Sequence, residues 1–179
     1  CTDPACCSAW LPVAAAQEKW GDDFAGWEAR IEEAVAATDG QVALYDGQPI
    51  LAVFHSSSAG KTEAAGSVWS GDVPYLRSVD SPEGEETVPN YYSAATFTAA
   101  EAKALLSAAH PELTFSGGPD KWFGAAERDA SGRVGTIEVC GTALRGVEVR
   151  RIFSLRSACF TVEAAAEQVT FRVTGYGHG

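Results

Sequence analysis

The sequence predicts an α+β fold with a mixed, largely antiparallel sheet and flanking helices. Helical and extended patterns alternate along the chain, an Asp-Gly pair joins two extended apolar runs, and strands surround a helix in the C-terminal third. A length of 179 residues suits one domain with room for a small second lobe. We therefore assign residues 1–179 to one domain.

The first elements follow from spacing and turn chemistry. Residues 26–37 carry apolar side chains at helical spacing, which predicts a helix. Residues 41–45 and 48–54 predict two strands joined at Asp46-Gly47, a strong hairpin signal. Because residues 50–54 are apolar on both faces, we expect the second strand to lie centrally in a covered sheet.

A turn-rich stretch and a capped helix come next. Residues 81–90 resemble a linker and could separate two lobes. Thr98 with Glu101 three residues later forms a capping box that opens a helix, and Pro111 ends it. His110, just before that proline, is expected to cap the helix.

The C-terminal part predicts strands over residues 133–139 and 159–174, with a helix near residues 147–153 between them. Cys140 and Cys159 then lie on neighbouring strands. Whether they form a disulfide depends on their separation in space, which the sequence leaves open.

Charge excludes two classes of partner. The net charge of −11 argues against binding to nucleic acid and against a polybasic contact with anionic lipid. Four basic residues are expected to form a solvated face, namely Arg145, Arg150, Arg151 and Arg156. No apolar run reaches the roughly 18 residues that a membrane-spanning helix needs.

The five cysteines form an odd set, and three of them crowd one end. Adjacent cysteines are poor disulfide partners but good zinc ligands, so Cys1, Cys6 and Cys7 could bind a metal or be oxidised thiols at a chain end. The chain opens on Cys1 and contains no methionine. We therefore expect it to be a piece of a longer protein.

The segment Ser58-Ala59-Gly60-Lys61-Thr62 resembles the end of a phosphate-binding loop. Such a loop needs an earlier glycine where this chain has His55, and the preceding strand belongs to a hairpin rather than a parallel sheet. We therefore predict no nucleotide binding. His55 itself is expected to be a hydrogen-bonded structural residue.

Several segments in the same order resemble the stage II sporulation protein D family. That family has a T-x-G-x-V-x-x-Y hairpin, an F-H-x-S-S-G-G-x-T-E loop, V-W and P-Y-L-x-x-V, a C-T-D-x-x-H-C motif upstream, and G-x-E-x-R, L-R-S and G-Y-G-H-G motifs downstream. The matching segments are residues 1–7, 38–63, 68–69, 74–79, 146–150, 155–160 and 175–179. The resemblance covers nearly the whole chain.

The resemblance implies a peptidoglycan lytic transglycosylase that works outside the cytoplasm, at the cell surface or engulfing septum of a spore-forming bacterium. Its substrate would be glycan strands without stem peptides, cleaved between N-acetylmuramic acid and N-acetylglucosamine to leave 1,6-anhydro ends. Two alternatives remain, a non-catalytic enhancer of an amidase and a zinc hydrolase with an open metal position. A membrane anchor, if present, would lie upstream.

In the family, one glutamate acts as general acid and lies on a helix upstream of the cysteine motif. No such segment occurs in this sequence, so we expect the chain alone to be inactive. Glu63 is the nearest carboxylate to the loop motif, but a role at the start of a helix is the better interpretation.

The resemblance also suggests binding residues. Small polar residues of the loop are placed beside the glycan, where they would contact sugar hydroxyls, and the C-terminal motif adds two more: Ser56, Ser57, Ser58, Gly60, Thr62, Tyr176 and His178. The family has glycine where this chain has Ala59, which would be strained at a positive φ. Trp69 and Tyr75 could stack on sugars, although packing against the core is favoured.

The cysteine motif of the family binds zinc, and its histidine position is Cys6 here. The resemblance therefore implies a structural zinc ion held by Cys1, Cys6 and Cys7. Each of these groups also has an alternative. The loop could be an ordinary serine-rich turn, His178 could be an exposed terminal histidine, and the cysteines could be oxidised thiols at a clipped terminus.

Overall fold

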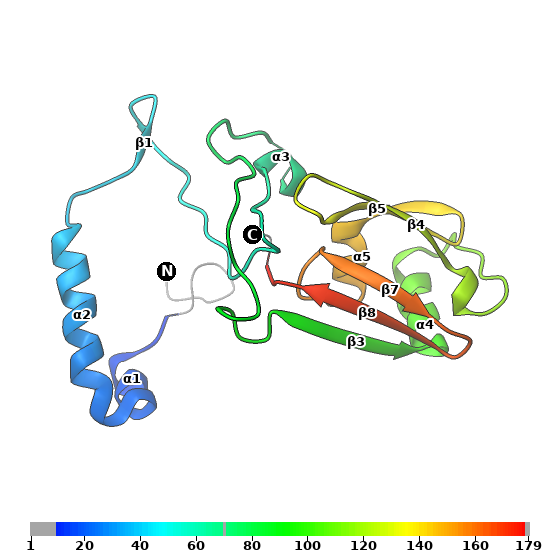
Figure 1. Ribbon diagram of the computed structural model, residues 1–179, viewed down its shortest axis with the longest axis horizontal. Coiled ribbons are helices and arrows are strands. Elements are labelled where there is room, and N and C mark those ends of the chain that lie inside the picture. The colour runs from blue at the N-terminus through cyan, green and yellow to red at the C-terminus, as the bar shows by residue number, and fades with distance from the viewer. Residues whose placement is uncertain (1–9, 70, 178–179) are drawn as a thin grey trace. The chain divides into compact units, whose positions relative to one another are not determined.

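The computed structural model describes residues 10–69 and 71–177, and the chain divides into two compact units, residues 1–51 and 52–179 (Figure 1). The expected α+β class is confirmed. Residues 81–90 lie inside the second unit, so they do not separate the two units.

The first unit contains helices and one short hairpin. Its elements are α1 (Val13–Trp20), a 3-10 turn (Gly21–Asp23), α2 (Phe24–Ala37), β1 (Leu44–Tyr45) and β2 (Gln48–Pro49). The predicted helix is thus confirmed as α2. The turn uses Asp46 and Gly47 at φ 49° and 74°, as a two-residue hairpin turn with both central residues left-handed requires.

The expectation of a central strand over residues 48–54 is wrong, because β2 covers only Gln48–Pro49. The ladder stops after Ile50 N–H donates to Ala43 O, and residues 51–54 belong to none of the strands of the described chain. Phe54 is 77% exposed. An apolar run becomes a covered strand only where another strand pairs with it, and the sequence alone does not show such a partner.

The second unit contains two antiparallel sheets. Their strand orders are β3-β8-β7 and β4-β5-β6, and every pairing among the described strands is antiparallel. The strands are β3 (Tyr92–Thr98), β4 (Phe123–Arg128), β5 (Val134–Val139), β6 (Thr142–Arg145), β7 (Phe160–Ala164) and β8 (Gln168–Thr174). The strands expected over residues 133–139 and 159–174 are confirmed as β5 and the β7–β8 hairpin.

Aromatic packing builds the core of this unit. Val169, Phe171 and Val173 alternate inward along β8, as a strand with one covered face requires. The Phe171 ring lies 4.5 Å from that of Phe153 and 5.6 Å from that of Phe160, measured between centroids. Complete burial of one such side chain contributes about 1.5–3 kcal/mol.

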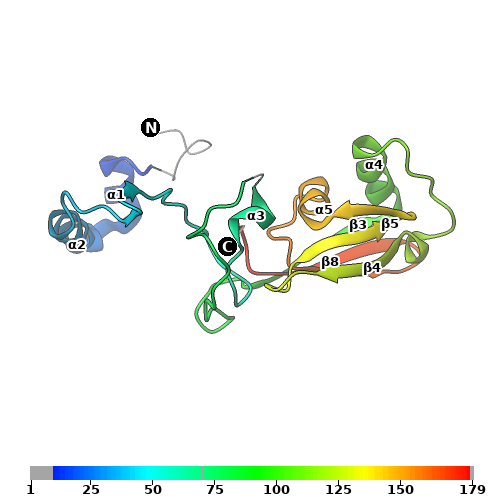
Figure 2. The same cartoon turned by 90° about the horizontal axis from the view of Figure 1, so that it is seen from above.

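The remaining helices are α3 (Ala65–Val68), α4 (Ala99–Ala109) and α5 (Gly146–Ile152), with a 3-10 turn at Pro119–Lys121. Figure 2 shows α4 and α5 on one side of the strands. The capping box is confirmed, since Thr98 Oγ1 accepts from the Glu101 N–H and Glu101 Oε2 accepts from the Thr98 N–H.

His110 caps α4 as expected and also links it to α5. Its N–H donates to Leu106 O, while Nδ1 lies 2.9 Å from Glu112 Oε1 and Nε2 lies 3.1 Å from Glu148 Oε1. The hydrogen bond with Glu112 is the largest cause that raises the pKa of His110, against the opposing effect of burial. The protonated His110 imidazole therefore joins the two helices more strongly than the neutral imidazole would.

Candidate functional site

The loop of residues 55–62 is held against the C-terminal segment. Ser57 and Tyr176 exchange two backbone hydrogen bonds, 3.0 and 3.2 Å long. Gly175 makes this approach possible, because it has φ 63° and an added Cβ would lie 2.5 Å from Ser58 O. Residues 57 and 176, far apart in sequence, thus lie side by side and form one continuous surface.

Glu83 fixes the loop from the other side. It accepts the Ser58 N–H at 2.9 Å, the Ser58 hydroxyl at 3.0 Å and the Ser81 hydroxyl at 2.7 Å. Burial alone would raise its pKa, but the hydrogen bonds from Ser81 and Ser58 outweigh burial and lower the pKa to about 2. Glu83 is therefore ionised at neutral pH and acts as a clamp, which we call the Glu83 clamp.

The clamp determines where the predicted glycan-binding serines point. Ser57 and Ser58 are fully buried, and the Ser57 hydroxyl donates to Ser58 O. Their hydroxyls therefore hold the loop in place. His55 Nε2 lies 3.4 Å from Glu83 Oε1, consistent with a hydrogen-bonded structural residue.

The outer part of the loop is tied to residues 77–81. Thr62 N–H donates to Val79 O, and Thr62 Oγ1 accepts from the Val79 N–H at 3.0 Å. Gly60 has φ 96°, whereas Ala59 is absent from the residues with positive φ, so the strain considered for Ala59 does not arise within the described chain.

A pocket of about 470 Å³ opens beside this loop, which we call the loop pocket. Ser56 and Thr62 reach it from the loop, Trp69 and Tyr75 from the following segment, and Gly177 from the C-terminal segment. Trp69 is 47% exposed, so the favoured expectation that it packs into the core is wrong for this residue. Tyr75 is half-buried.

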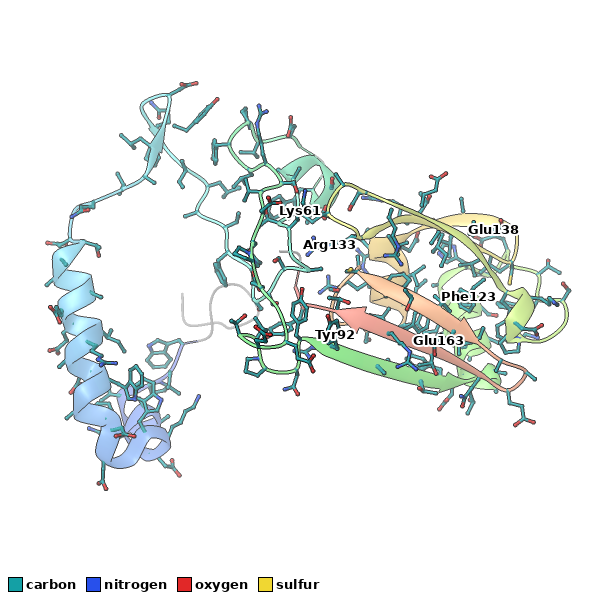
Figure 3. The ribbon with its side chains drawn as sticks, in the orientation of Figure 1. Lys61, Tyr92, Phe123, Arg133, Glu138 and Glu163 are labelled. Carbon is teal, nitrogen blue, oxygen red and sulfur yellow. The ribbon has the colours of Figure 1, made fainter. Side chains whose placement is uncertain are left out.

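The sequence suggested a role for Glu63 at the start of a helix, and that expectation is wrong. Its carboxylate forms an ion pair with Arg133, with Nη1 2.8 Å from Oε1, and also accepts from the Ser131 hydroxyl. Both charged side chains are nearly buried, at 6% and 5% exposure. Figure 3 shows Arg133 reaching toward the loop that carries Lys61, whose carbonyl accepts from Arg133 at 3.4 Å.

The other site residues divide into described and undescribed ones. Tyr176 lies under Arg156, whose Cζ is 4.1 Å from the ring centroid, and its hydroxyl donates to Pro89 O at 3.5 Å. His178 and the predicted zinc ligands, Cys1, Cys6 and Cys7, lie outside the described residues. Residues 10–69 and 71–177 contain no group of three potential metal ligands.

Cys140 and Cys159 are both free thiols, so the disulfide left open by the sequence is not formed in this structure. Burial raises the pKa of each thiol, which keeps both protonated at neutral pH. In the described chain, no helix is both long and apolar enough to cross a bilayer.

Sequence reasoning missed Glu83 and Arg133, the two charged residues that organise the site. Glu83 lies in the linker-like stretch and Arg133 immediately precedes β5, so each contacts the loop only through the tertiary fold. No local pattern marks either residue. The positive φ of Gly175, by contrast, is suggested by the glycine-rich motif around it.

Comparison with known proteins identifies related sequences. The chain is 34% identical over 163 residues to stage II sporulation protein D of Bacillus subtilis, covering 91% of this chain and 46% of that protein. It is also 34% identical over 163 residues to the protein of the same name from Bacillus amyloliquefaciens. The chain thus spans about half the length of these curated relatives.

A shorter similarity links the chain to the amidase enhancer of Bacillus subtilis, with 46% identity over 50 residues, or 28% of this chain and 7% of that protein. No protein-family model matches the chain. The resemblance deduced from the ordered motifs is therefore confirmed over most of the chain's length.

Proposed function

Because this chain belongs to the stage II sporulation protein D family, we propose that it supplies one glycan-binding wall of a peptidoglycan lytic transglycosylase. The whole protein would act on peptide-free glycan strands outside the cytoplasm of a spore-forming bacterium. The muramyl 6-hydroxyl attacks C1, the bond to the N-acetylglucosamine oxygen breaks, and a 1,6-anhydro end forms. A general acid protonates the leaving oxygen and then takes the proton of the attacking hydroxyl.

The loop pocket is the observation that carries this proposal. It joins a hydroxyl-bearing loop to an exposed tryptophan, and the two together suit a pyranose ring. Ser56 and Thr62 offer hydroxyls at its edge, while Gly177 allows the backbone to approach a ligand closely. The loop is rigid because the Glu83 clamp and the Ser57–Tyr176 bridge hold it from both sides.

Glu83, which contacts the loop, and Glu63, which follows it, are both unsuited to be the general acid. A proton donor for a glycosidic oxygen needs a pKa near the working pH, and that of Glu83 is lowered to about 2. Glu63 would have to give up its buried ion pair with Arg133 to act. As the family resemblance implies, the acid would be a glutamate upstream of Cys1, and the chain alone should not cleave glycans.

The three N-terminal cysteines are the proposed ligands of a zinc ion. Three thiolates form a donor set that suits zinc, and Cys1, Cys6 and Cys7 would hold the ion. Its contribution would be structural, fixing the segment that precedes the glycan-binding unit.

A second candidate is a non-catalytic enhancer that binds peptidoglycan and assists another wall hydrolase. The similarity to an amidase enhancer over 50 residues favours it. This candidate shares the glycan-binding wall and differs only in lacking turnover by the whole protein.

Binding of peptide-free glycan oligosaccharides to the chain tests the shared claim. Trp69→Ala should weaken binding about five- to tenfold, the amount expected for loss of one aromatic stacking contact. Trp27→Ala is the matched control, because Trp27 lies in the first unit and is also 47% exposed. Equal affinities for both variants and the unchanged chain would refute the assignment of the loop pocket.

A further inference from the structure

A second pocket, of about 470 Å³, adjoins the loop pocket between α3 and α5, and we call it the arginine pocket. Arg145, Arg150 and Arg151 line it, together with Trp69 and Ser154. Arg145 and Arg151 are exposed, as expected for a solvated face, and together with the half-buried Arg150 they surround one hollow.

The charge of this pocket opposes that of the chain. The sequence carries 24 acidic and 13 basic residues, yet no acidic residue is among the described residues that line the arginine pocket. Local positive charge in a chain of net charge −11 is a departure from its average surface, and it attracts anions at close range.

The three arginines differ in the hydrogen bonds and ion pairs that they form. Arg150 is anchored, since its Nε donates to Leu155 O and its Nη2 to Arg156 O. Burial lowers its pKa, and the charge of Arg133 lowers it further. Neither Arg145 nor Arg151 has an ion pair among the described residues.

The positions of these two arginines are set by regular structure. Arg145 ends β6, is paired with Thr136 of β5, and immediately precedes α5. Arg151 lies in the last turn of α5. Groups mounted on paired strands and helices are better placed to bind a fixed ligand than groups on a loop.

The arginine pocket continues the glycan-binding wall. Val68 and Trp69 line both pockets, so a sugar stacked on Trp69 would place its substituents within reach of the arginines. A guanidinium binds a carboxylate through two parallel N–H···O bonds, a geometry that hydroxyls and acetamido groups cannot match.

We propose that the arginine pocket binds a carboxylate carried by a sugar of the glycan, namely the lactyl carboxylate of a muramyl residue without its stem peptide. The assignment rests on the proposed function and deepens it. A stem peptide converts that carboxylate into a neutral amide, so the arginine pocket selects peptide-free strands by charge. Arg145 and Arg151 supply the recognition, and Arg150 holds the shape of the pocket.

The test measures binding of the chain to three probes at two salt concentrations. The probes are peptide-free glycan oligosaccharides with free lactyl carboxylates, the same oligosaccharides with these carboxylates amidated, and a polyol phosphate polymer. The unchanged chain should bind the free carboxylate form about tenfold more tightly than the amidated form. Added salt should reduce that preference.

The double variant Arg145→Gln with Arg151→Gln should bind both glycan forms equally and retain the affinity of the unchanged chain for the amidated form. Arg172→Gln, an exposed arginine on the other sheet, should keep the tenfold preference. Circular dichroism matching the unchanged chain would show that the double variant folds.

The outcomes separate the two claims. Equal binding of both glycan forms by the unchanged chain would overturn the arginine pocket while the glycan-binding function stands. No binding of either form would overturn both. Tighter, arginine-dependent binding of the phosphate polymer would reassign the pocket to phosphate and so contradict the carboxylate assignment.

Discussion

The Glu83 clamp gives the most precise prediction. Glu83→Gln keeps the shape of the side chain but removes the negative charge that accepts hydrogen bonds from Ser58 and Ser81. A fall in pKa from 4.5 to about 2 corresponds to about 3 kcal/mol, at about 1.36 kcal/mol per pH unit. Because the side chain is 21% exposed, solvent screening reduces the expected loss to about 1–2 kcal/mol at pH 7.

The pH dependence follows from the direction of the shift. The carboxylate has a lower pKa when folded, so its stabilisation is fully present above about pH 4.5 and disappears as the pH falls through about 2. Urea unfolding of the chain and of Glu83→Gln, followed by near-ultraviolet circular dichroism, gives the difference at each pH. Glu86→Gln, on the same exposed stretch, is the control.

The expected difference between Glu83→Gln and the unchanged chain is about 1–2 kcal/mol at pH 7 and close to zero near pH 2. An equal loss at both pH values would show that shape rather than charge matters. No loss at pH 7 would refute the clamp itself.

Three further predictions concern the buried pair, the core and the metal. Glu63→Gln should destabilise the chain by about 3–5 kcal/mol, because it leaves Arg133 buried without its counter-charge, and adding Arg133→Met should recover much of the loss in urea unfolding. Phe171→Ala should cost about 3–5 kcal/mol in the same assay, because it opens a cavity where the Phe153 and Phe160 rings meet. The reduced whole protein should bind zinc in about equimolar amount by elemental analysis, and serine at the three N-terminal cysteine positions should abolish it.

Local patterns predicted the elements well, because they depend on residues close in sequence. The Thr98–Glu101 capping box, the Asp46-Gly47 turn and the strands within residues 159–174 all appear in the structure as the sequence indicated. Residues 48–54 failed because strand pairing depends on a distant partner that an apolar run does not reveal.

The residues that hold the candidate site together could not be predicted from the sequence. The loop motif and the C-terminal glycine motif do meet, at Ser57 and Tyr176. The serines were expected to face a ligand, yet Ser57 and Ser58 are buried and hold the loop. Their partner Glu83 lies 25 residues beyond Ser58 in a segment without secondary structure, so only the folded chain shows the contact.

The most direct test of the central claim is digestion of purified, peptide-free glycan strands by the whole natural protein, with the products read by mass spectrometry. Muramic acid with 1,6-anhydro ends is the predicted product, and the 179-residue chain alone should release none. Reducing ends would show hydrolysis and contradict the transglycosylase assignment. Intact strands that remain bound to the folded protein would instead identify a non-catalytic enhancer.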